Sequence, residues 1–160
     1  MTEAHGVGDA AGQHRMAGGC QCGAVRYTAQ IPVLEASLCH CRMCQRATGG
    51  FAAALVTVPR AAVDWHGAPT WFDSSPIAQR PFCPRCGSPL GFAFRDSPDM
   101  ELTLGSFDAP DAPEAFAPAG HFGTESLHEA WLDTRALPRQ TSGDNPRVAE
   151  RWRAAGQEVP

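Results

Sequence analysis

The sequence predicts a single, mostly β domain that binds metal and carries a short C-terminal helix. Three observations point to this class. The chain has 160 residues, about the size of one domain. Its apolar runs are short and bounded by Gly, Pro or Asp, as strand boundaries are. Its seven cysteines fall into three clusters, which is typical of metal sites in a reducing compartment.

Five apolar runs are expected to be strands: 24–31, 51–58, 71–73, 89–94 and 100–104. Apolar side chains alternate in two of these runs: at Val25, Tyr27 and Ala29, and again at Leu90, Phe92 and Phe94. With 14 prolines and 16 glycines in the chain, long helices have little room. One short helix is expected over 145–156, because Asn at the N-cap, Pro at the first position and Gly just past the end are helix boundary signals.

These signals divide the chain into three parts. We expect a disordered tail rich in Gly, Ala and polar residues at 1–17, a zinc-containing β domain at 18–138, and a helical extension at 139–160. Nothing in the sequence indicates an oligomeric state.

Composition excludes several classes of function. A net charge of −4 with 19% charged residues argues against nucleic-acid binding, which needs a concentrated basic face. No run of 18 apolar residues occurs, so no membrane span is expected, and the N-terminus carries no apolar leader. We therefore expect a cytoplasmic protein with reduced thiols. Because the chain has no Lys, Schiff-base chemistry on a lysine is ruled out.

Two of the cysteine motifs predict a closed zinc site. Cys83 and Cys86 are followed by Gly87, and Cys20 and Cys22 are followed by Gly23. In such a turn the glycine lets backbone amides approach the second sulfur without a side-chain clash. Each turn supplies two ligands, so the two together complete a tetrahedral site of four thiolates that contributes mainly to folding.

The three remaining cysteines, Cys39, Cys41 and Cys44, are spaced closely enough to chelate a second zinc with one position left open. Three protein ligands plus an exchangeable one is the usual form of a catalytic zinc site. Because three thiolates already make the site electron-rich, a soft fourth ligand such as a substrate thiolate suits it better than water. His40 lies in an extended C-x-C, where its side chain points away from both sulfurs, so it is interpreted as a neighbouring or surface histidine rather than a ligand.

Two other divisions of the cysteines remain open at this point. One zinc could take Cys39, Cys41, Cys44 and a cysteine of another pair, leaving three thiols free. The set could instead be a redox relay, although thioredoxin-type C-x-x-C motifs open a helix in a βαβ unit and no such pattern occurs here.

Three segments carry a family resemblance: GCQCGAVRY at 19–27, CHCRMCQRATG at 39–49 and RPFCPRCGSPL at 80–90. They resemble the glutathione-dependent formaldehyde-activating enzyme (GFA) family, whose domain is shared with centromere protein V. Later pieces, GSFD at 105–108 and GHF at 120–122, also fit, so the resemblance runs from about residue 18 to 138.

The resemblance implies a mostly β zinc fold with two metals. Cys20, Cys22, Cys83 and Cys86 match the structural-zinc positions, and Cys39, Cys41 and Cys44 match the catalytic ones. It also implies a carbon–sulfur lyase-type activity like that of S-(hydroxymethyl)glutathione synthase, in which a small thiol joins a small aldehyde such as formaldehyde.

Candidate residues beside the open zinc follow from that chemistry. His40 or a zinc-bound water would return a proton to the new hydroxyl. Carboxylates of a glutathione-like thiol would favour arginine, and Arg42 and Arg46 are the substrate-binding candidates, with Arg80 and Arg85 also beside the motifs. The competing hypothesis is a non-catalytic zinc-binding interaction module of the same fold.

Overall fold

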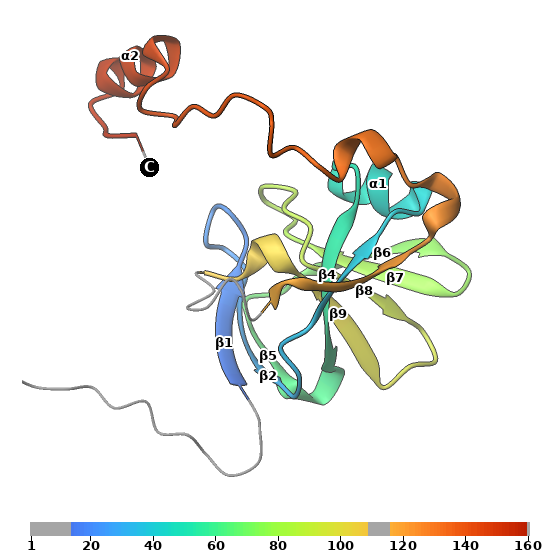
Figure 1. Cartoon of the computed structure of the whole chain (residues 1–160). Coiled ribbons are helices and arrows are strands. Elements are labelled where there is room, and N and C mark those ends of the chain that lie inside the picture. Colours follow the sequence, from blue (N-terminus) through green and yellow to red (C-terminus); the bar gives the residue numbers. More distant parts are fainter. Residues whose placement is uncertain (1–13, 109–115, 160) are drawn as a thin grey trace, which may run out of the picture. The chain divides into compact units, whose positions relative to one another are not determined.

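The structure is a computed structural model that describes residues 14–108 and 116–159. These residues form a first compact unit that reaches Leu127 and a second unit, His128–Pro160. The first unit contains all the strands in the described part of the chain, arranged in a three-stranded and a seven-stranded sheet (Figure 1). The mostly β class predicted from the sequence is therefore confirmed.

The smaller sheet has the order β1-β2-β5 and is antiparallel. Its strands are β1 (His14–Gly19), β2 (Arg26–Ile31) and β5 (Val63–His66). Because His14 pairs with Ile31, the ordered β structure begins four residues before the predicted boundary at Gly18. Residues 1–13 of the predicted tail lie outside the described residues.

The larger sheet has the order β10-β3-β4-β9-β8-β7-β6. Its strands are β3 (Ala36–Cys39), β4 (Ala53–Pro59), β6 (Thr70–Ser75), β7 (Ala78–Phe82), β8 (Gly91–Phe94), β9 (Asp99–Thr103) and β10 (Pro118–Phe122). All neighbours are antiparallel except β10 and β3, which run parallel. Five of the strands in the two sheets, β2, β4, β6, β8 and β9, overlap the runs predicted from the sequence.

The core lies between the two sheets and is built by side chains that alternate along the strands. Tyr27, Ala29 and Ile31 of β2 are buried, and they join Val56 and Val58 of β4 in one cluster. This alternation explains why these segments are strands: one face of each is apolar and packed, whereas the other faces away.

Two α-helices occur in the described residues. α1 (Arg42–Thr48) follows β3 directly and contacts β4, and it ends at Gly49 in the left-handed conformation. α2 (Pro146–Ala154) is the predicted C-terminal helix, with Asn145 as N-cap and Pro at the first position. The Asn145 side chain accepts a hydrogen bond from the Arg147 N–H at 3.1 Å. No helix in the described part of the chain is both long and apolar enough to cross a membrane.

Candidate metal centres

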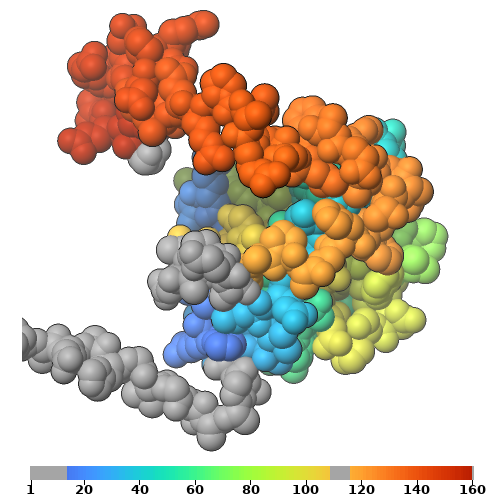
Figure 2. Space-filling view, in the orientation of Figure 1, coloured from blue at the N-terminus to red at the C-terminus, as the bar shows by residue number. Residues whose placement is uncertain are grey.

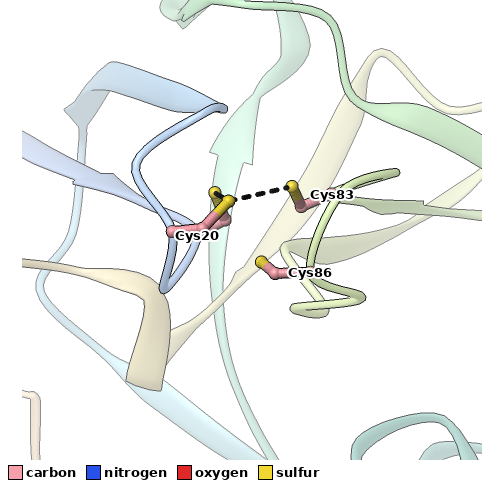
Figure 3. Close-up of side chains that lie close together, drawn as sticks. Cys20, Cys83 and Cys86 are labelled. Carbon is pink, nitrogen blue, oxygen red and sulfur yellow. Dashed lines mark hydrogen bonds between the residues drawn. The ribbon is translucent and has the colours of Figure 1, made fainter.

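Four cysteines from two turns far apart in the sequence come together in the first unit. Cys20 and Cys22 lie on the turn between β1 and β2, and Cys83 and Cys86 lie on the turn between β7 and β8 (Figure 3). Their four sulfur atoms all lie within 4.8 Å of one another. We call this group the Cys20 cluster.

Glycines shape both of these turns as the sequence predicts. Gly23 and Gly87 adopt φ values of 75° and 77°, a conformation that residues with a Cβ rarely adopt. The Gly23 N–H donates to the Cys20 carbonyl at 3.1 Å, and the Gly87 N–H donates to the Cys83 carbonyl at 2.9 Å. Each turn therefore directs its two sulfurs toward one point.

The sulfur spacing of the Cys20 cluster fits a tetrahedral zinc site. Zinc–thiolate bonds of about 2.3 Å place tetrahedral sulfurs about 3.8 Å apart. The Cys20 and Cys22 sulfurs are 3.6 Å apart, and the Cys22 and Cys83 sulfurs are 3.9 Å apart. Four soft donors at this spacing suit Zn²⁺ and leave no position for a further ligand.

Ser88 links the two turns of the Cys20 cluster. Its hydroxyl accepts a hydrogen bond from the Gln21 N–H at 3.1 Å and lies 3.1 Å from the Cys86 sulfur. Hydrogen bonds from the Ser88 hydroxyl and backbone hold the pKa of Cys86 well below its ordinary value. Ser88 therefore favours the thiolate form that a metal ligand requires.

The other three cysteines form a second group at the junction of β3 and α1. Cys39 ends β3, Cys41 is the N-cap of α1, and Cys44 lies in the first turn of that helix. Their sulfurs also lie within 4.8 Å of one another, with Cys39 and Cys41 3.6 Å apart. We call this group the Cys39 cluster. Burial raises the pKa of the Cys39 thiol, which opposes its ionisation.

Strand β10 lies against the Cys39 cluster from the edge of the sheet. All five residues of β10 are exposed, and Figure 2 shows this strand, in light orange, on the surface. The Phe122 carbonyl accepts a hydrogen bond from the His40 N–H at 2.8 Å. A Cβ atom on Gly123 would lie 2.7 Å from the Cys41 nitrogen, so the two backbones are in close contact.

His40 is fully buried, and its ring nitrogen Nε2 lies 2.9 Å from Nδ1 of His121 on β10. Because its donor atoms are not among those that converge with the three sulfurs, it does not join the cysteine donor set. His40 therefore lies between two cysteines of the cluster in the sequence, and its side chain contacts an exposed histidine.

Arg80 contacts the Cys39 cluster from β7. Its side chain is only 9% exposed, and one guanidinium N–H donates to the Cys44 sulfur at 3.3 Å. The guanidinium also lies over the Phe92 ring, 4.9 Å from its centroid. The sequence indicated Arg80 only as one of four arginines beside the motifs. No local pattern in the sequence distinguishes it, because Ala78, Arg80 and Pro81 are all buried and β7 does not alternate strictly.

Two cavities in the described part of the chain share lining residues near the clusters; one is lined by Cys20, and the other by Arg80, which bonds to Cys44. The larger has a volume of about 530 Å³, and its lining includes Cys20 and the ion pair between Arg26 and Asp108. The smaller has a volume of about 370 Å³ and is lined in part by Arg80. Both are lined by Thr48, Pro89 and Thr103, and we call the two together the groove.

The predicted substrate-binding arginines lie outside this groove. Arg42 and Arg46 are exposed on α1, and neither lines either of the two cavities. Arg42 donates a hydrogen bond to the Gln45 side chain. Arg26 and Arg80 are the arginines in the groove lining, and no spacing rule in the sequence separates them from the others.

Comparison with known proteins gives a family match. The model of a family described as glutathione-dependent formaldehyde-activating enzyme matches residues 15–126, which end next to the boundary of the first unit at Leu127. The crystal structure of a Rhodobacter sphaeroides protein is similar in fold, with a TM-score of 0.55 and 22% sequence identity. The similarity covers 66% of this chain and 99% of that one. No curated protein matches the sequence.

Proposed function

The chain belongs to the glutathione-dependent formaldehyde-activating enzyme family, and from that membership we propose that it is a zinc-dependent carbon–sulfur lyase-type enzyme. The proposed reaction adds a small, glutathione-like thiol to a small aldehyde such as formaldehyde. The family match covers residues 15–126, so it includes every cysteine of both clusters.

The observation that carries the proposal is the unequal number of donors in the two clusters. The Cys20 cluster offers four sulfurs, enough to close a tetrahedral site. The Cys39 cluster offers three, and in the part of the chain that the structure describes no further Cys, His, Asp or Glu donor joins them. A three-donor set leaves a coordination position for a substrate, which is the form of catalytic zinc sites.

Cys39, Cys41 and Cys44 would hold the reactive zinc, and the Cys20 cluster would hold a structural one. Zinc bound to three thiolates supplies a soft Lewis acid that keeps an incoming thiol ionised near neutral pH. The groove, lined by Thr48 of α1 and by Arg80 beside Cys44, offers the volume for a peptide-sized thiol. Holding thiol and aldehyde together there raises their effective concentration.

The addition needs a proton as well as a nucleophile. The sulfur electron pair forms the new carbon–sulfur bond, the carbonyl π pair moves to oxygen, and that oxygen takes up one proton. His40 is the candidate proton donor, and its contact with the exposed His121 gives a route by which a proton could be replaced from solvent. Arg42 and Arg46 are exposed on α1, the helix that carries Cys44, and are the candidates for holding carboxylates of the thiol substrate that extend beyond the groove.

Cys44→Ser separates the enzyme from a non-catalytic zinc module. We expect the wild-type protein to contain two zinc ions per chain, and the variant to lose one of them while it stays folded. Glutathione binding and glutathione-dependent formaldehyde consumption should be lost with that ion. Cys22→Ser is the matched control, because loss of a ligand from the closed site should lower the melting temperature instead. Two zinc ions without any thiol binding in the wild type would favour the non-catalytic module.

A further inference from the structure

Arg80 is a charged residue at a core position. It lies on β7 between β6 and β8, and it is the arginine among the buried polar and charged residues of the described chain. A buried guanidinium is costly unless its charge and its N–H groups are compensated. The compensating groups therefore indicate what the residue does.

Two contacts and one charge interaction compensate the guanidinium. The Cys44 sulfur accepts one of its hydrogen bonds at 3.3 Å, and the Phe92 ring lies 4.9 Å below it. On β9, Glu101 is partly buried, which raises its pKa, and the positive charge of Arg80 acts against that rise. Phe92 and Glu101 are paired across β8 and β9, so both face the guanidinium from neighbouring strands.

The charge of the Cys39 cluster makes the first of these contacts significant. Three thiolates carry three negative charges, and a divalent cation offsets only two of them, so one negative charge remains beside α1. The guanidinium at Cys44 neutralises that remaining charge. In the Cys20 cluster the groups hydrogen-bonded to sulfur are neutral instead of charged: Cys20 bonds to the Val25 N–H, and Cys86 bonds to the Ser88 hydroxyl.

We propose that Arg80 is a positioning residue for the Cys39 cluster, holding the Cys44 sulfur with a charged hydrogen bond and neutralising the excess charge of the three thiolates. This rests on the proposed function to the extent that the Cys39 cluster binds zinc. Since Arg80 also lines the smaller cavity, the same guanidinium joins the cluster to the groove. Lysine is a poor replacement because it lacks the planar group that stacks on Phe92 while it bonds to sulfur.

The test compares metal binding in Arg80→Met, Arg80→Lys and the control Arg60→Met. Arg60 is matched because its guanidinium also lies over an aromatic ring, Trp71 at 5.7 Å, but bonds to backbone carbonyls instead of a cysteine. Zinc affinity is measured by competition with a chromophoric chelator. The zinc that is missing in Cys44→Ser identifies the affinity that belongs to the Cys39 cluster. Cobalt replacement then gives the sulfur-to-metal charge-transfer band as a spectroscopic readout of the Cys44 sulfur.

Loss of a group that holds a metal ligand in place typically weakens metal binding about 10–100-fold. We expect that loss at the Cys39 cluster in Arg80→Met, with a shifted cobalt band, a smaller loss in Arg80→Lys and wild-type binding in Arg60→Met. Wild-type affinity in folded Arg80→Met would overturn the proposal. If Arg80→Met does not fold, unchanged affinity and an unchanged band in Arg80→Lys would overturn it. A wild-type protein that binds only one zinc would overturn the proposed function as well, so the two failures are distinguishable.

Discussion

Replacing Gly123 with Ala tests whether the end of β10 holds the backbone of the Cys39 cluster in place. Gly123 has a φ of 65°, and a Cβ atom there would lie 2.7 Å from the nitrogen and 2.8 Å from the Cβ of Cys41. Real Cβ atoms do not approach backbone so closely, so the substitution forces either Cys41 or the chain at residue 123 to move. Cys41 supplies one of the three sulfurs of the cluster.

Two contributions add to the expected loss of stability. Placing a non-glycine residue in the left-handed conformation costs about 1–2 kcal/mol. Forcing an extra carbon into a packed contact costs about 1–3 kcal/mol more. We therefore expect Gly123→Ala to lower the free energy of unfolding by about 2–5 kcal/mol and to weaken zinc binding at the Cys39 cluster.

Two other glycines separate these contributions. Gly49 ends α1 with a φ of 71° but has nothing within 4 Å of a built Cβ, so Gly49→Ala carries the backbone cost alone. Gly120 in β10 has open space and no positive φ, so Gly120→Ala should change stability by no more than about 0.5 kcal/mol.

Urea unfolding and zinc titration of the three variants give the result. Equal stability of Gly123→Ala and Gly49→Ala, with equal zinc content, would refute the argument from close contact. Reduced zinc binding in Gly49→Ala alone would instead place the sensitive point at the C-terminal end of α1.

Two further predictions concern the Cys20 cluster and the groove. Ser88→Ala removes the hydroxyl that contacts both Gln21 and Cys86. The variant should lower the free energy of unfolding by about 1–3 kcal/mol and weaken zinc binding at the Cys20 cluster alone. Equal weakening of zinc binding at both clusters in a chelator titration would contradict this. Arg26 holds the pKa of Asp108 below its ordinary value, so the stabilisation is complete at pH 7 and is lost only as the pH falls through that lowered pKa. Both partners are more than a third exposed, so Asp108→Asn should lower the free energy of unfolding, measured with urea at pH 7, by less than about 1 kcal/mol. In 1 M salt this difference between wild type and variant should become smaller. A larger loss that salt does not change would show that Asp108 does more than pair with Arg26.

Strand β2 could be predicted from the sequence, whereas β10 and α1, which depend on their partners or on an unusual cap, could not. β2 shows strict alternation of buried and half-buried residues, and the sequence predicts it. β10 is exposed along its whole length, so PAGHF carries no alternation, and only its pairing with β3 makes it a strand. α1 was missed because a cysteine sulfur takes the place of the usual Ser, Thr, Asn or Asp at its N-cap.

The membership of the two cysteine clusters follows the division of four and three that ligand counting predicts. Thiol type, spacing and a coordination number of four suffice for that division. The groups around the sulfurs depend instead on tertiary contacts. The bond from Arg80 to Cys44 joins residues 36 positions apart, and the contact between His40 and His121 joins residues 81 apart. Neither separation is specified by a local motif.

The two clusters are connected through a single strand. Cys83 of the Cys20 cluster comes one residue after β7 ends, and Arg80 lies within β7. A zinc held by Cys20, Cys22, Cys83 and Cys86 would tie the end of β7 to the turn after β1 and would limit how far β7 can slide. Arg80, whose guanidinium bonds to Cys44, is only three residues before Cys83 in the sequence, so a metal held by Cys83 would also restrict the position of Arg80. A closed metal centre in this position would contribute to stability and would also hold Arg80 in place beside Cys44.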